Sequence, residues 1–152
     1  MRLRSQQPAR RGATTVETAC VIVLALMFIF GIIEYGRLLW FYHTAYAAVR
    51  EGARYASVRT GDRTTDAQVK DRVLRVMGGA QNQLGSSYVV SVYNADPATG
   101  NATAGDWTDA PFGGAIGVRM QGTYKFFLPG LMQIAGDSLA VDMKCTINSE
   151  AN

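Results

Sequence analysis

The sequence predicts an α+β protein in which one long N-terminal helix packs on a small antiparallel sheet. Three features of the sequence support this prediction: an apolar uncharged run near the N-terminus, an amphipathic helical pattern that continues it, and three alternating segments in the second half of the chain. A chain of 152 residues has room for one domain core and an attached segment.

The apolar run, residues 18–33, is uncharged and ends at Glu34. Its length as a helix is about 24 Å, which is less than the roughly 30 Å hydrocarbon layer of a bilayer. A second uncharged stretch, residues 38–49, follows Arg37, so one continuous helix can complete the crossing. We therefore predict a membrane-spanning segment over residues 13–37, with Glu34 and Arg37 as an ion pair at the far interface.

Charge is distributed unevenly along the chain. Residues 1–12 hold four of the 15 basic residues and none of the 12 acidic ones. The remainder carries no basic stripe interleaved with aromatic residues, so nucleic acid is not an expected partner. A basic flank before the apolar run predicts a cytoplasmic N-terminus, which leaves the C-terminal domain outside the membrane.

The long helix is expected to continue beyond the membrane, from about Thr14 to about Val58. Its packing face is predicted to hold Leu38, Tyr42, Ala45, Val49, Ala53 and Ala56, with His43, Arg50, Arg54 and Ser57 on another face. After a polar break, residues Thr65 to Gln68 fit a capping box that opens a second helix, and Gly78 closes that helix.

Three later segments alternate apolar and polar residues as half-buried strands do: residues 88–93, 116–126 and 139–147. The order of the three strands stays open. Residues 94–114 form a long loop between the first two, either a mobile surface element or a contact site. A short turn or helix is expected near residues 131–135. The apolar faces of the strands need a cover, and the long helix is available for it.

No residue pattern points to catalysis. The sequence contains no nucleophile elbow, phosphate loop or paired acid signature. His43 has no second histidine or cysteine at ligand spacing, so we expect no metal site. Cys20 and Cys145 belong to opposite ends of the molecule and should both stay free. We expect a protein that is not an enzyme, with no catalytic residues and no cofactor.

Three segments together resemble the TadE-like family of bacterial pilus-assembly proteins, pseudopilins of the tight-adherence or Flp pilus system. They are RRGATTVE from Arg10, the apolar span that ends GIIEYGRLLW, and AVREGARYA from Ala48. The resemblance implies a pilin-like fold and an inner-membrane precursor that a prepilin peptidase cuts between Gly12 and Ala13, just before the helix. It thus implies a leader over residues 1–12 and an extracytoplasmic domain over residues 38–152.

Cleavage at this position gives Glu17 a partner. The new ammonium of Ala13 lies four residues before Glu17, on the same face of a helix. A carboxylate at the membrane edge is costly unless paired, so an N-terminal amine of the same or an adjacent subunit can pair with it and set subunit register. The alternative is that residues 14–17 form a capping box. Glu34 likewise has two interpretations, the interfacial pair with Arg37 or an assembly contact.

The predicted function is that of a minor pilin or pseudopilin in the assembly of a Flp or Tad pilus, held in the bacterial inner membrane by a single span. The implied partners are the prepilin peptidase, other pilin or pseudopilin subunits, the inner-membrane assembly platform and the lipid bilayer. Two alternatives stay open: an uncleaved single-pass scaffold with a periplasmic binding domain, and a soluble domain released between Ala47 and Ala48, where the sequence reads A-x-A.

Overall fold

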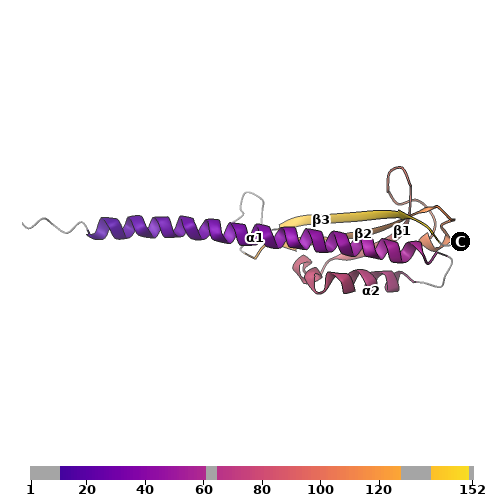
Figure 1. The fold of residues 1–152 in the computed structure, drawn as a ribbon, viewed down its shortest axis with the longest axis horizontal. Helices are drawn as coiled ribbons and strands as arrows, with labels where there is room; N and C mark the ends of the chain where they lie inside the picture. The colour runs from indigo at the N-terminus through magenta and orange to yellow at the C-terminus, as the bar shows by residue number, and fades with distance from the viewer. Residues whose placement is uncertain (1–10, 61–64, 128–137, 151–152) are drawn as a thin grey trace, which may run out of the picture.

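The structure is a computed structural model, and it describes residues 11–60, 65–127 and 138–150. The elements follow in the order α1 (Arg11–Ser57), α2 (Asp66–Met77), the 3-10 helix η1 (Ala80–Leu84), β1 (Val89–Ala95), the 3-10 helix η2 (Trp107–Asp109), β2 (Ala115–Lys125) and β3 (Ser138–Asn148). Figure 1 shows α1 as a rod whose N-terminal part extends away from the domain and whose C-terminal part lies along the sheet. The predicted α+β fold class is confirmed.

The helix α1 has 47 residues, which begin three positions before the predicted start at Thr14 and end one position before Val58. Among the described residues it is the one helix long and apolar enough to cross a membrane, and its most apolar stretch is not buried by the domain. Leucine, isoleucine and valine surround this stretch on all sides, so it has no polar face to turn toward water. The helix is compatible with a single-pass membrane protein.

The second half of α1 has one buried face. Its fully buried residues are Phe41, Ala45, Ala48, Val49, Ala53 and Ala56. Two predicted positions are wrong: Tyr42 is exposed, and Ser57, assigned to the polar face, is buried. Phe41 takes the place of Tyr42 because it lies four residues before Ala45, on the line that faces the sheet. Ser57 is accommodated because its hydroxyl donates a hydrogen bond to the Arg54 carbonyl oxygen at 3.0 Å.

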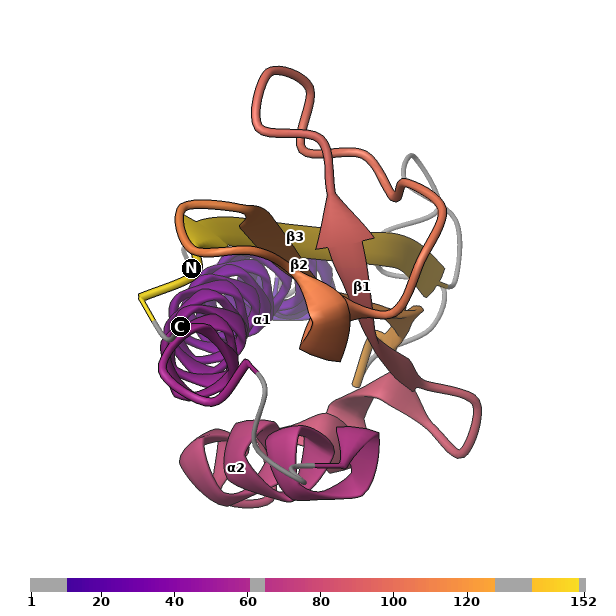
Figure 2. The ribbon, with the colours of Figure 1, turned by 90° about the vertical axis from the view of Figure 1, so that its right-hand side faces the viewer.

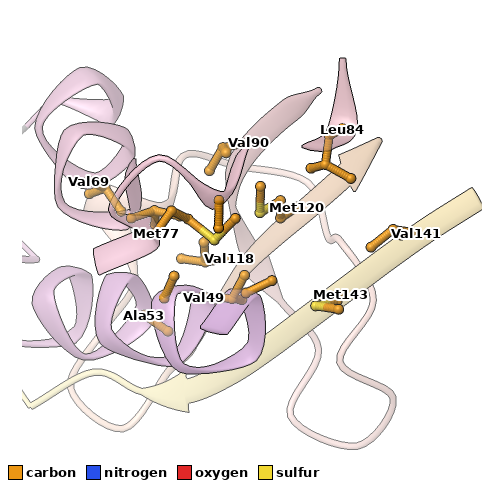
Figure 3. Packing of buried hydrophobic residues seen from close by; sticks show 14 of the residues in the cluster. Val49, Ala53, Val69, Met77, Leu84, Val90, Val118, Met120, Val141 and Met143 are labelled. Carbon is orange, nitrogen blue, oxygen red and sulfur yellow. The ribbon is translucent and has the colours of Figure 1, made fainter. Parts of the chain in front are cut away.

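The sheet is antiparallel, with the strands in the order β1-β2-β3. Figure 2 shows α1 and α2 on the same side of this sheet and the loop after β1 on the opposite side. The central strand places Val118 opposite Val92 of β1 and Cys145 of β3. In Figure 3, side chains from both helices and from the strands meet in one core, among them Val49, Val69, Met77, Val118 and Met120.

The second helix begins and ends at the predicted residues, but the predicted hydrogen bonds at its N-terminus do not form. Thr65 is the N-cap residue, yet its side chain makes no capping hydrogen bond, so the predicted capping box is wrong. The start is stabilised by tertiary contact, because the Asp66 carboxylate accepts a hydrogen bond from the Trp107 indole at 2.6 Å. At the other end, Gly78 adopts a left-handed conformation with φ of 55°, which residues other than glycine rarely adopt.

The segment between β1 and β2 is partly fixed by local structure. Strand β1 runs to Ala95, so the loop begins two residues later than predicted, and Ala95 forms an isolated bridge with Ala102. Trp107 in η2 is 2% exposed and anchors the loop to α2. The turn or helix expected near residues 131–135 lies outside the described residues. The 3-10 helix η1 was not anticipated.

Gly52 is a point of close contact between α1 and α2. A Cβ atom at this position would lie 2.4 Å from Cγ2 of Val73, whose branched side chain has little freedom to move in a helix. We expect Gly52→Ala to lower the free energy of unfolding by about 1–2 kcal/mol, since overpacking exceeds the gain in helix propensity. Thermal unfolding of the detergent-solubilised chain measures this effect.

Gly36→Ala is the matched control, because Gly36 also lies in α1 and a Cβ atom there meets nothing within 4 Å. It should leave stability unchanged or slightly raised. A Gly52→Ala/Val73→Ala double variant should lose less than the sum of the two single losses, since the second change removes the clash. Equal stability of Gly52→Ala and Gly36→Ala would contradict this packing.

Candidate functional site

The predicted pair Glu34 and Arg37 is brought together at the place where the sheet first meets α1. Glu34 is 3% exposed, and its Oε1 accepts a hydrogen bond from Nη2 of Arg37 at 2.7 Å. The same oxygen accepts a second hydrogen bond from the backbone N–H of Phe127 at 3.2 Å. The hydroxyl of Tyr124 also donates to it, at 3.5 Å. One carboxylate oxygen therefore joins α1 to the end of β2.

Arg37 also joins α1 to the end of β2. Its Nη2 donates to the Lys125 carbonyl oxygen at 3.1 Å as well as to Glu34. Its Cζ lies 5.3 Å from the ring centroid of Tyr124 and 5.7 Å from that of Phe127, distances at which a cation is attracted to an aromatic face. We call Glu34, Arg37, Tyr124 and Phe127 the helix-sheet junction.

The electrostatics of the junction favour a rigid connection. Burial raises the pKa of the Tyr124 hydroxyl, so it stays protonated and available as a donor. A buried carboxylate without partners is strongly destabilising, whereas this one has a guanidinium and two further donors. The arrangement ties α1 to the end of β2, because separating the two would take the Tyr124 and Phe127 donors away from the Glu34 carboxylate. It would also break the contacts of Arg37 with the Lys125 carbonyl oxygen and the two rings.

The sequence indicated only half of the junction. The spacing of Glu34 and Arg37 predicts their ion pair, but Tyr124 and Phe127 lie about ninety residues further along the chain. The alternation in residues 116–126 places Tyr124 on the inward face of its strand, which was the available signal. Nothing in the sequence relates the end of that strand to Glu34. Contacts of α1 with the sheet thus begin inside the predicted membrane segment, residues 13–37.

The predicted processing residues, Gly12 and Ala13, lie in the first turn of α1 and not before it. The bond between them is therefore part of the helix in the uncut chain. Glu17 is exposed, and because α1 is continuous it shares a helical face with Ala13, four residues earlier. In the uncut chain Thr14 is an interior residue of a helix that begins at Arg11, so it does not cap that helix. For a chain cut before Ala13, the capping-box interpretation of residues 14–17 stays a prediction.

The outer face of the sheet carries a second polar cluster. Arg119 and Asp142 form a two-point ion pair across β2 and β3, and hydrogen bonding to Arg119 lowers the pKa of Asp142. Lys144 donates to the side-chain oxygen of Asn101 at 3.3 Å, so the loop covers part of this face. The cluster has two cations and one anion, and both cations already have partners in it, Asp142 for Arg119 and Asn101 for Lys144. We assign no ligand to it.

Both described cysteines are free, with Cys20 exposed on α1 and Cys145 partly buried on β3. Burial raises the pKa of the Cys145 thiol, which makes it less reactive than an exposed cysteine. His43 is exposed on α1. The described residues include no group of three or more histidine, cysteine, aspartate or glutamate side chains placed to hold a metal ion.

Comparison with known proteins finds a family model that matches the N-terminal helix. Residues 12–54 match the family model described as TadE-like protein, which confirms the resemblance found in the sequence. No curated protein matches the chain, and no solved structure matches it. The matched segment begins at Gly12, contains Glu17, Glu34 and Arg37, and covers most of α1. The TadE-like family implies involvement in a Tad or Flp pilus system.

Proposed function

We propose that the chain is a minor pilin or pseudopilin of a Tad or Flp pilus, cut by a prepilin peptidase between Gly12 and Ala13. The observation that carries this proposal is the continuity of α1, one helix that is apolar on all sides in its first half and forms the domain core in its second. Such a helix can serve as membrane anchor and as packing surface at once. Its role in pilus assembly is mechanical and not catalytic.

The charge distribution supports an orientation for the anchored protein. The four arginines among residues 1–12 favour a cytoplasmic N-terminus, so the sheet and α2 lie on the periplasmic side of the inner membrane. The peptidase then meets the Gly12–Ala13 bond at the cytoplasmic face. Because this bond lies in the first helical turn, cutting requires that turn to unwind, which glycine facilitates because it weakens a helix.

Release of a soluble domain at Ala47 fits the packing poorly. A cut there divides α1 between Ala45 and Ala48, both of which are fully buried in the core. The released part would lose Phe41, which is also fully buried, together with the Glu34 end of the helix-sheet junction. Removing large buried side chains costs several kcal/mol each. The packing therefore supports a domain that keeps its whole helix.

Glu17 has the position expected of a residue that acts between subunits. It is exposed, and after the proposed cut it lies four residues beyond the new ammonium of Ala13. In a bundle of parallel helices with an axial stagger, the ammonium of one subunit can pair with Glu17 of the next. A charge left unpaired in lipid is expensive, so misaligned subunits are disfavoured.

We expect the Glu17→Ala variant to be cut and inserted in the membrane as normal but to lose co-isolation with other pilus subunits. Affinity purification from gently solubilised membranes measures the loss, and the mass of the variant checks its processing. Thr18→Ala is the matched control, because Thr18 is the adjacent exposed residue and its hydroxyl bonds only within α1, to the Thr14 carbonyl oxygen. Unchanged co-isolation of Glu17→Ala would count against the register role.

A further inference from the structure

Phe127 is a large apolar side chain left open to solvent at the end of the sheet nearest to the apolar part of α1. Its side chain is 74% exposed, although its neighbour Phe126 is 8% exposed and belongs to the core. The position of Phe127 along α1 is fixed, because its backbone N–H bonds to Glu34 and its ring lies 5.7 Å from the Arg37 guanidinium carbon. Phe127 therefore lies at the level of Glu34 and Arg37.

That level coincides with the edge of the bilayer. The uncharged run over residues 18–33 is shorter than the roughly 20 residues that a helix needs to cross the hydrocarbon layer. The membrane must therefore extend to at least one of the charged residues at the ends of the run. The bilayer can extend as far as Glu34, because the Glu34 carboxylate is buried against the sheet and paired with Arg37. The outer boundary of the bilayer then falls at the helix-sheet junction.

The other exposed side chains at this level have the composition of a membrane interface. Tyr35 and Trp40 of α1 are 56% and 54% exposed, and Lys125 at the end of β2 is exposed. Tyrosine and tryptophan rings are enriched at the headgroup level, and lysine is attracted to anionic headgroups. Phe127 adds a third exposed aromatic ring at this level, on the sheet instead of the helix.

The opposite end of the domain has no such relation to the membrane. Phe112 is 70% exposed, which is close to the value for Phe127. However, Phe112 lies before the start of β2, whereas Phe127 lies after its end. The 11-residue strand between them is roughly 35 Å long, so the two residues lie at opposite ends of the sheet. The far end is tied to the end of α1, since the backbone N–H of Glu150 donates to the Ser57 carbonyl oxygen at 2.8 Å.

We propose that the Phe127 end of the sheet is a second membrane contact, in which Phe127 enters the headgroup region of the bilayer that α1 spans and Lys125 faces anionic headgroups. This inference rests on the proposed membrane insertion of α1. Two contacts at different points of the membrane plane fix the rotation and tilt of the domain about α1, which a single helix leaves free. The partner is the lipid surface itself.

Fluorescence quenching by labelled lipids tests the contact. The full-length chain, with Cys20→Ala and Cys145→Ala, receives one new cysteine at a time: Phe127→Cys, Phe112→Cys as matched control, or Ala25→Cys within the apolar run. Each carries an environment-sensitive fluorophore in vesicles of phosphatidylcholine and phosphatidylglycerol. We expect a nitroxide at the lipid headgroup to quench position 127 and not position 112, and a nitroxide deep in the acyl chain to quench position 25.

The three positions separate the inference from the proposed function. Quenching at position 25 without quenching at position 127 overturns the second contact and leaves membrane insertion intact. Absence of quenching at position 25 overturns insertion, and the second contact with it. A label at position 127 that is shielded from a water-soluble quencher only at high protein density, and that no lipid nitroxide quenches, indicates a protein partner and also overturns the proposal.

Discussion

The Gly12→Trp variant is expected to remain uncut, so that the protein extracted from membranes keeps all of residues 1–12. The Gly12–Ala13 bond lies in the first turn of α1, and a peptidase can reach it only if that turn opens. Glycine weakens a helix by roughly 1 kcal/mol relative to alanine and leaves the N-terminal side of the bond without a Cβ atom. Tryptophan removes both properties. Intact-mass measurement separates the cut and uncut forms by the mass of the leader.

Two further variants make this result specific. Gly12→Ala should be cut more slowly than the unaltered chain, since it strengthens the helix but adds only a methyl group. Gly36→Trp should be cut normally, because Gly36 lies far along α1 and a Cβ atom there meets nothing within 4 Å. Normal processing of Gly12→Trp would reject the proposed position of the cut.

Arg37→Ala is expected to destabilise the helix-sheet junction by about 3 kcal/mol, the low end of the range for one partner lost from a buried pair. The low end applies because the Arg37 side chain keeps 30% exposure while that of Glu34 has 4%. The change leaves the Glu34 carboxylate buried with only the weaker donors Tyr124 and the Phe127 backbone. It also removes both cation-ring contacts. Denaturant unfolding in detergent measures the loss.

Arg75→Ala serves as the matched control, because Arg75 also pairs with an acid on its own helix, Asp71, but both side chains are about 70% exposed. Such a pair contributes about 0–1 kcal/mol. A Glu34→Gln/Arg37→Met double variant keeps an acceptor for Phe127 and buries no charge, so it should be more stable than Arg37→Ala. If Arg37→Ala costs no more than Arg75→Ala, the junction does not hold the domain as described.

Periodicity alone predicted the main elements of the fold. The apolar run and the spacing of small residues after it gave α1 to within three residues at its start and one at its end. Alternation located all three strands, because a half-buried strand repeats every two residues regardless of its partners. The order of the strands was not accessible, since alternation shows which face of a strand is buried but not which strand lies beside it.

The errors arose where tertiary contacts overrode local patterns. Tyr42 and Phe41 are adjacent, and the choice between them depends on a rotation of α1 that only the sheet determines. The start of α2 looked like a capping box, but Asp66 bonds to Trp107 and Thr65 makes no side-chain cap. The contacts of Tyr124 and Phe127 with Glu34 could not be predicted from the sequence either, because they depend on how far β2 extends along α1. Such contacts follow from packing and not from spacing.

The mature N-terminus of the chain extracted from membranes tests the central claim most directly. N-terminal sequencing and intact-mass measurement should find a protein that begins at Ala13, remains in the membrane fraction and retains the whole apolar half of α1. A chain that begins at Met1 would indicate an uncleaved scaffold. A soluble chain that begins at Ala48 would contradict the claim that one helix is both the anchor of this protein and the core of its domain.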